Sequence, residues 1–171
     1  AAVLAAVKEA EIAANVEDNV NEPFISGDLK GSKVKKEKET IYGATEWTLK
    51  NGVKVVVLPT QYKQDQVMFS IKKKGGNSLI ATEDMPSFES NIWTLFVNNS
   101  GISKFSGTQV SKMLAGKNLS VTPFIGATQH GVQGSSTPKD FETALQLMYL
   151  YFADPRFDEA EYETGIQQIK A

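Results

Sequence analysis

The side chains that could do chemistry are limited, because the chain has one histidine, His130, and no cysteine. A zinc site takes three or four ligands, drawn mainly from cysteine and histidine. A serine or cysteine triad needs a histidine base that a third group orients. The chain could supply at most one imidazole to either kind of site, and no pair of carboxylates stands out as an acid–base couple. The sequence therefore predicts that these 171 residues are not a complete enzyme.

The remaining candidate side chains have simpler structural explanations. His130 lies in GATQHGVQG, a strand-like stretch in which an edge or surface histidine is a better interpretation than a substrate contact. Ser135 and Ser136 directly precede Thr137, a candidate helix cap. We therefore interpret both serines as the residues that lead into this cap rather than as nucleophiles.

Charged residues form two groups near the ends of expected elements. The consecutive lysines Lys72, Lys73 and Lys74 close a strand-like stretch. They could line the path of an acidic substrate, but basic residues at strand ends are more commonly just exposed. Five acidic residues surround the start of the last expected helix: Asp154, Asp158, Glu159, Glu161 and Glu163. The helix dipole explains such acids without a metal, and their spacing is not that of a calcium loop.

Composition narrows the class of protein. The net charge of −2 and a pI near 5.5 give no general electrostatic reason to bind nucleic acid or an anionic membrane. The longest apolar run, around 147–153, is far shorter than the roughly 20 residues of a transmembrane helix. Neither Gly75-Gly76 nor the glycines of 131–134 have the G-x-G-x-x-G spacing of a dinucleotide site. The lack of cysteine suits either the cytosol or the bacterial periplasm.

The β-type patterns predict an antiparallel sheet. Two strand-like runs flank Asn51-Gly52 in TEWTLKNGVKVVVL, and this dipeptide favours a two-residue type I′ turn, in which both central residues have positive φ. A third strand is expected where Val67, Phe69 and Ile71 alternate with other residues. Three such strands suggest one antiparallel sheet with a covered face. A second pair of strands is expected in NLSVTPFIGAT and QHGVQGSS.

Three- and four-residue spacings predict the helices. One spans Met85–Val97, a shorter one spans Thr108–Ala115, and a strong one opens at Thr137 with proline in its first position. The strong helix is expected to bury Phe141, Leu145, Met148 and Phe152. Most aromatic residues in these helices are expected in the core, with Trp93 or Tyr149 at an interface: Phe88, Trp93, Phe96, Phe141, Tyr149 and Phe152.

The two ends of the chain differ from its middle. Residues 1–15 favour an amphipathic helix, and Val16–Gly43 has the composition of a linker, with a charged run over Lys33–Glu39 that we expect to be solvated. The last helix begins near Asp158 and meets no stop signal before the chain ends. We therefore expect a fragment of a longer protein.

Several stretches resemble the pitrilysin family of zinc peptidases, the inverted-zincin or M16-type family. They are LKNGVKVVVLPTQYKQDQVMFSIKKKGG, then a helix, then KFSGTQVSKMLAGK and SSTPKDFETALQLMYLYFADPRFDEAEYE, and together they span about Thr45–Lys170. The family includes the mitochondrial processing peptidases and insulin-degrading enzyme, and it forms a chamber from two related halves, each with two α+β domains. In one half a helix carries H-x-x-E-H, whose histidines bind zinc and whose glutamate activates water.

The resemblance implies a domain without this motif. The matching helix reads MPSFESNIWTLFV, which has no histidine and only Glu89 as a carboxylate; we interpret Glu89 as a solvated side chain. The implied fold is α+β, a mainly antiparallel sheet with helices packed on one face, as in a truncated mitochondrial-processing-peptidase-like domain. Residues 1–44 would be the end of a preceding domain and an interdomain linker, and 45–171 the truncated domain.

The expected function is that of a non-catalytic domain of a bacterial zinc metalloendopeptidase, which closes the proteolytic chamber and helps to bind peptide or unfolded protein. The resemblance assigns no catalytic, cofactor or metal residue to this chain, and it places zinc in the other half of the parent. The partner would be that catalytic half of the same polypeptide. Family analogy favours the periplasm. Such enzymes capture peptides at sheet edges, but the sequence does not identify the edge strand or the contacting residues.

Two alternatives stay open. The chain would show the same degenerate helix if it came from a catalytically inactive scaffold or assembly relative of the family. It could also be an unrelated α+β binding domain, which a mainly parallel sheet would favour.

Overall fold

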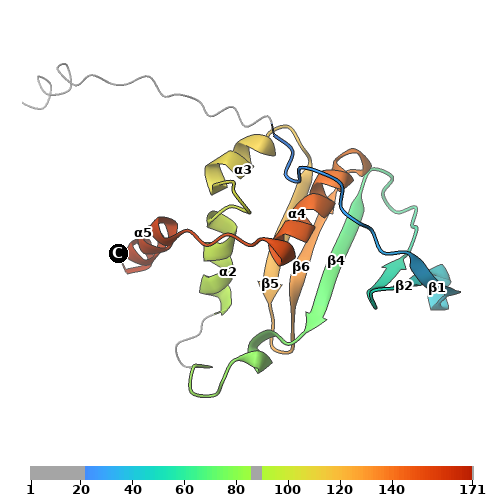
Figure 1. The fold of residues 1–171 in the computed structure, drawn as a ribbon, viewed down its shortest axis with the longest axis horizontal. Helices are drawn as coiled ribbons and strands as arrows, with labels where there is room; N and C mark the ends of the chain where they lie inside the picture. The colour runs from blue at the N-terminus through green and yellow to red at the C-terminus, as the bar shows by residue number, and fades with distance from the viewer. Residues whose placement is uncertain (1–21, 86–89, 171) are drawn as a thin grey trace, which may run out of the picture.

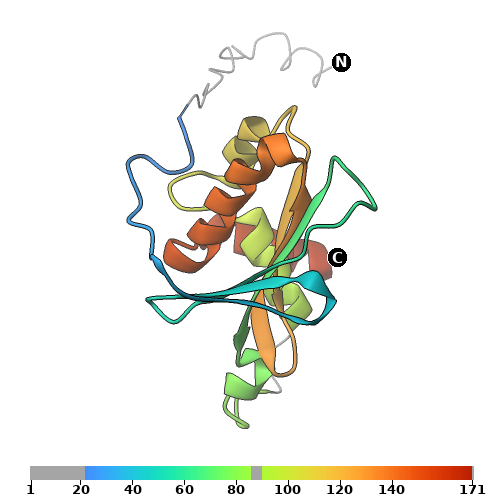
Figure 2. The same ribbon diagram turned by 90° about the vertical axis from the view of Figure 1, so that its right-hand side faces the viewer.

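The computed structural model describes residues 22–85 and 90–170, which form two separate antiparallel sheets and four α-helices (Figures 1 and 2). The predicted α+β class with antiparallel pairing is confirmed, and the absence of parallel pairs in the described residues removes the argument for an unrelated fold. Within these residues, every helix falls short of the length and hydropathy that crossing a bilayer requires.

Sheet A consists of β1 (Val34–Glu39), β2 (Thr45–Leu49) and β3 (Lys54–Val57), with β2 in the middle. The hairpin around Asn51-Gly52 is confirmed, but the predicted turn type is wrong. The Leu49 N–H donates to the Val53 carbonyl at 2.8 Å, so the loop has three residues. Gly52 has a φ of 88°, whereas Asn51 is not in the positive-φ region. A loop of three residues that ends in a left-handed glycine needs only one such residue.

Sheet B consists of β4 (Val67–Lys74), β5 (Leu119–Ile125) and β6 (Gln129–Ser136), in the order β4-β6-β5. The strand pair β5–β6 is confirmed. The expectation that β4 shares a sheet with the hairpin is wrong, because β4 pairs with β6, with Ile71 opposite Val132. Alternation shows that a strand is half-buried, but it does not identify the neighbouring strand.

The glycines of β6 have a packing role. At Gly131, an added Cβ would lie 1.9 Å from the carbonyl oxygen of Ile71. At Gly134, it would lie 1.9 Å from the carbonyl oxygen of Ser120. A side chain at either position would therefore displace a neighbouring strand. This explains the glycines of 131–134 without a nucleotide site.

The α-helices are α2 (Ser90–Asn99), α3 (Gly107–Met113), α4 (Phe141–Ala153) and α5 (Glu159–Lys170), and short 3₁₀ turns lie at η1 (Ile41–Gly43), η2 (Gly76–Leu79) and η4 (Pro138–Asp140). The predicted cap is confirmed: the Thr137 hydroxyl accepts the Asp140 N–H at 3.3 Å. The Asp140 carboxylate also accepts the Asn118 N–H at 2.9 Å, which joins the start of α4 to the start of β5. Phe88 and Glu89 lie outside the described residues.

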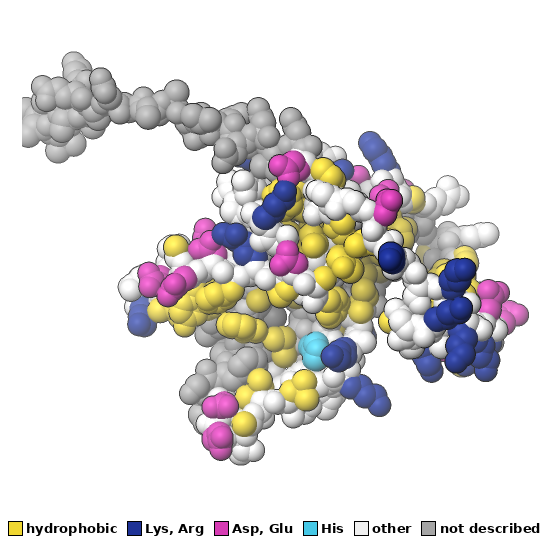
Figure 3. All heavy atoms as spheres, in the orientation of Figure 1, with side chains coloured by type: hydrophobic (Ala, Val, Ile, Leu, Met, Phe, Trp, Pro, Cys, Tyr) yellow, Lys and Arg dark blue, Asp and Glu magenta, His cyan; other side chains and the backbone are white. Residues whose placement is uncertain are grey.

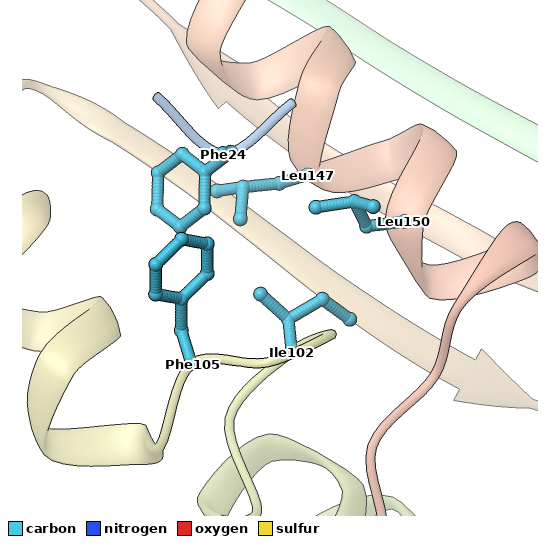
Figure 4. Close-up of a cluster of buried hydrophobic side chains, with 5 residues drawn as sticks. All are labelled: Phe24, Ile102, Phe105, Leu147 and Leu150. Carbon is cyan, nitrogen blue, oxygen red and sulfur yellow. The ribbon is translucent and has the colours of Figure 1, made fainter. Parts of the chain in front are cut away.

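The core lies against α4, where three distant segments of the chain meet (Figure 4). Leu147 and Leu150 from α4 face Ile102 and Phe105 from the loop between α2 and α3. Phe24 completes the cluster and packs edge-on against the Phe105 ring, with 5.7 Å between centroids. The core thus includes a side chain from the stretch that the sequence indicates as a linker.

The same stretch also supplies β1, whose residues are all exposed, as expected for the charged run over Lys33–Glu39. β1 pairs with β2, so backbone hydrogen bonds rather than apolar burial order it. The domain boundary at 44/45 remains a prediction, and the helix expected over 1–15 lies outside the described residues.

The buried face of α4 differs from the predicted stripe. Ala144, Leu147, Met148 and Leu150 are buried, whereas Leu145 and Phe152 are 45% and 47% exposed. Nearly every position of this helix is apolar, so two stripes with helical spacing were available in the sequence, and only the fold selects between them. α4 therefore has a second apolar face, which is partly exposed.

Candidate functional site

The second apolar face of α4 lines a groove beside β4. The groove has a volume of about 350 Å³ and is bordered by Ile71, Leu145, Met148, Tyr149, Phe152 and Ala153. We refer to it as the α4–β4 groove. Hydrophobic side chains gather over α4 on this face of the molecule (Figure 3). Tyr149 is 46% exposed here, and its expected interface position stays a prediction. Large apolar side chains on one surface are typical of a binding site.

The groove runs beside an open sheet edge. β4 is hydrogen-bonded to β6 along one edge, and no strand of the described residues pairs with its other edge. The opposite edge of sheet B belongs to β5, which α2 contacts and which contains Pro123. Since proline cannot donate to a ladder, β4 offers the better edge for an added strand.

Three lysines occupy the C-terminal end of this open edge. Lys72, Lys73 and Lys74 are exposed, as the sequence predicts. The ion pairs among the described residues use other basic side chains. The edge of β4 therefore combines an apolar groove with a basic end.

His130 has a structural role next to the lysines, because it lies on β6 opposite Lys73 of β4. Its Nδ1 atom accepts the N–H of Gly76 at 3.0 Å, which fixes the turn that leaves β4. Gly76 has a φ of 67°, and an added Cβ would lie 2.1 Å from the Gly126 carbonyl oxygen. The histidine is half-buried and lies in β6, the middle strand of sheet B, so the edge position that the sequence allowed is wrong.

The serines of β6 do not form a nucleophile–base pair with it. Ser136 is buried, and its hydroxyl has no hydrogen-bond partner in the described part of the chain. His130 is six residues away on the same strand, a distance of about 20 Å at the usual rise per residue. This separation excludes direct proton transfer between the two side chains.

The acidic residues near α5 stabilise a helix start, as predicted. Asp158 accepts the N–H groups of Ala160 and Glu161 at 3.1 and 3.2 Å. The Arg156 guanidinium donates to the same carboxylate at 2.8 Å, and together these contacts hold the pKa of Asp158 below its ordinary value. Asp154 accepts the Ser103 hydroxyl at 2.5 Å. Each of these two acids therefore has a structural partner.

The aromatic residues divide between core and surface. Phe96 is buried and packs on Tyr162 with 4.7 Å between ring centroids, and Phe141 packs on Phe69 at 5.9 Å. Trp93 is partly exposed and stacks on Phe157 of the same chain, so its expected interface position stays a prediction.

Among the described residues, no group of side chains fits a zinc ion. Over 22–85 and 90–170, no three His, Asp or Glu side chains converge in a way that could hold a metal. The sequence adds that any such site would have at most one nitrogen ligand and no thiolate. We therefore derive no chemical step through a metal held by this chain.

The sequence did not reveal the groove as a site. The signal is present in α4, whose residues are apolar on more than one side, but helical spacing alone assigns all of these residues to the core. A helix that is apolar all round is either completely buried or covered by a partner on its second face.

Comparisons with known proteins support a fold rather than a close relationship. No family model matches the sequence, and no curated protein matches it. Among solved structures, the periplasmic protease PqqL from Escherichia coli matches 99% of this chain with a TM-score of 0.75 and 14% identity. The ferredoxin protease FusC, solved as an E83A mutant in complex with Arabidopsis ferredoxin, matches 98% with a TM-score of 0.63 and 20% identity.

The chain spans only 18% of PqqL and 19% of FusC. Because both identities are low, these likenesses carry information about the fold alone. They nevertheless agree with the resemblance to pitrilysin-type proteases noted in the sequence. The chain has the fold of a domain-sized part of these proteases.

Proposed function

We propose that this chain is a non-catalytic domain of a pitrilysin-type zinc metalloendopeptidase, in which it helps to close the proteolytic chamber and to bind peptide. The observation that supports this proposal most strongly is the shared fold with a part of two proteases over nearly the whole chain. The single histidine adds to it, because H-x-x-E-H needs two. The catalytic half of the same polypeptide would supply the zinc.

The α4–β4 groove is the surface through which this domain would act. An extended peptide can add to an open sheet edge through main-chain hydrogen bonds, which tolerate many sequences. The free edge of β4 supplies the backbone groups, and the adjacent apolar side chains supply pockets for alternate peptide residues.

The first test compares the parent protein with the isolated 171-residue chain. We expect the parent to contain one zinc ion and to cleave an unstructured peptide in a chelator-sensitive manner, while the isolated chain does neither. Zinc-dependent cleavage by the isolated chain would refute the non-catalytic assignment. A parent without zinc or cleavage would instead favour the scaffold alternative.

A second test examines the groove within the active parent. Leu145→Asp introduces a charge on an exposed apolar position, so we expect a higher KM for peptide with unchanged zinc content. Ile41→Asp is the matched control, because Ile41 is 77% exposed and does not line the groove. Equal KM values for the two variants would exclude the groove from substrate binding.

A further inference from the structure

We propose that the free edge of β4 and the α4–β4 groove bind an extended peptide with an acidic N-terminal end, followed by alternating apolar residues. This inference rests on the proposed peptide-binding function and specifies the class of peptide. Three observations support it: the side chains of β4 alternate between two faces, its outer edge is open, and three lysines lie at its C-terminal end.

The pleat of β4 separates its side chains into two faces. Phe69 packs against Phe141 of α4, and Ile71 lines the groove, so the odd-numbered residues of β4 face the helix. A strand added beside β4 would keep this alternation. Every second peptide side chain would therefore point toward the α4–β4 groove, where an apolar residue fits best.

The direction of the added strand fixes which end of the peptide meets the lysines. Both strand pairs of sheet B are antiparallel, and an added antiparallel strand would continue this pattern. The C-terminal end of β4, with Lys72, Lys73 and Lys74, would then lie opposite the N-terminal end of the peptide. Lys73 would be on the groove face, and the other two lysines on the opposite face.

The charge distribution favours an acidic occupant. Positions 30–74, which include sheet A and β4, contain eleven lysines and only four acidic residues, although the whole chain has a net charge of −2. Since Lys72, Lys73 and Lys74 form no ion pair with a described residue, acidic peptide residues would supply the missing partners.

The experiment measures fluorescence anisotropy of dye-labelled eight-residue peptides with the purified 171-residue chain. The first peptide is Glu-Asp-Glu-Val-Thr-Val-Thr-Val. The second has the same residues in reverse order, and the third replaces the three acids by Gln, Asn and Gln. A fourth copy of the first peptide carries N-methyl groups on alternate amides, which block pairing with a strand edge.

We expect the first peptide to bind most tightly, with an affinity that falls as salt concentration rises. Replacing Lys72, Lys73 and Lys74 by glutamine should weaken its binding about tenfold, since three cross-strand charge pairs are lost. The same replacement of Lys33, Lys35 and Lys36, which are exposed near and on β1, is the matched control and should change binding less than about twofold. Circular dichroism spectra would show that both variants are folded.

The outcomes separate this inference from the proposed function. If the neutral and reversed peptides bind as tightly as the first, or if both triple variants bind alike, the acidic specificity is wrong while peptide binding stands. If N-methylation has no effect, binding is not strand addition at β4, and the inference is also overturned. If no peptide binds, or if sedimentation shows a dimer that Leu145→Asp disrupts, the peptide-binding function fails together with the inference.

Discussion

The burial of Phe24 makes the most direct prediction about which residues belong to the fold. Phe24 lies at a position expected to be a linker, yet it is only 7% exposed and contacts the core on α4. Through this contact, we expect the segment before residue 45 to stabilise the domain instead of merely leading to it. Phe24→Ala tests this without removing any secondary structure.

The expected loss can be worked out from its surroundings. Removing a buried phenylalanine side chain costs about 3–5 kcal/mol through lost burial and the cavity that remains. The edge-on contact with Phe105 contributes about 1 kcal/mol of such a loss. Because Phe24 belongs to an extended segment that can collapse into the space, we expect the lower end, about 3 kcal/mol.

The assay is urea unfolding followed by circular dichroism and tryptophan fluorescence. With a slope of about 2 kcal/mol per molar urea, the midpoint should fall by about 1.5 M. Ile41→Ala is the control, because Ile41 lies in the same stretch but is 77% exposed. This substitution should lower the free energy of unfolding by no more than about 0.5 kcal/mol. A loss below about 1 kcal/mol for Phe24→Ala would refute the reasoning and would support a boundary at 44/45.

Two further substitutions test the turns that hold sheet B in place, and a third, in the hairpin of sheet A, is a control. The hydrogen bond from the Asn118 N–H holds the pKa of Asp140 below its ordinary value. The stability that this carboxylate provides is therefore fully present above the pKa that Asp140 has in the unfolded chain, near about 4. It is lost as the pH falls through the lowered pKa of the folded protein. Asp140→Asn should therefore lower stability at pH 7 and flatten its loss during acid titration, and an unchanged pH slope in urea unfolding would contradict this. Gly76→Ala would place a Cβ 2.1 Å from a backbone oxygen, so it should destabilise by more than about 3 kcal/mol. Gly52→Ala has open space at a φ of 88° and should cost only about 1–2 kcal/mol; similar losses for the two variants would contradict the steric argument.

Local signals in the sequence predicted the elements well. The Thr137 cap, the strands β5 and β6 and the acidic start of α5 depend on residues within a few positions of one another. Such interactions are decided by short-range geometry, so spacing alone identifies them. The hairpin was predicted for the same reason, although the number of loop residues, and hence the turn type, was not.

Contacts between distant segments could not be predicted in this way. The pairing of β4 with β6 joins residues more than fifty positions apart, as does the hydrogen bond from Gly76 to His130. Phe24 gave no signal because a single aromatic residue in a polar stretch has no periodicity. The candidate site combines β4, the lysines at its C-terminal end and α4, so it depends on contacts between distant segments and could not be predicted from local signals.

The two faces of α4 connect the packing of this domain with its proposed role. Met148 contributes to both the buried side and the groove, so the helix presents apolar surface continuously from the core to the open edge of β4. A helix that only stabilised this fold would gain solubility from polar residues at Leu145, Tyr149 and Phe152, at no cost to the core cluster. Large apolar residues there are stable in water only when another surface covers them, and in the proposed chamber that surface would be either a neighbouring domain or the bound peptide. The thermal stability and the KM of Leu145→Asp in the parent together distinguish the two. Loss of a contact with a neighbouring domain would lower thermal stability, whereas loss of a peptide contact would raise KM alone.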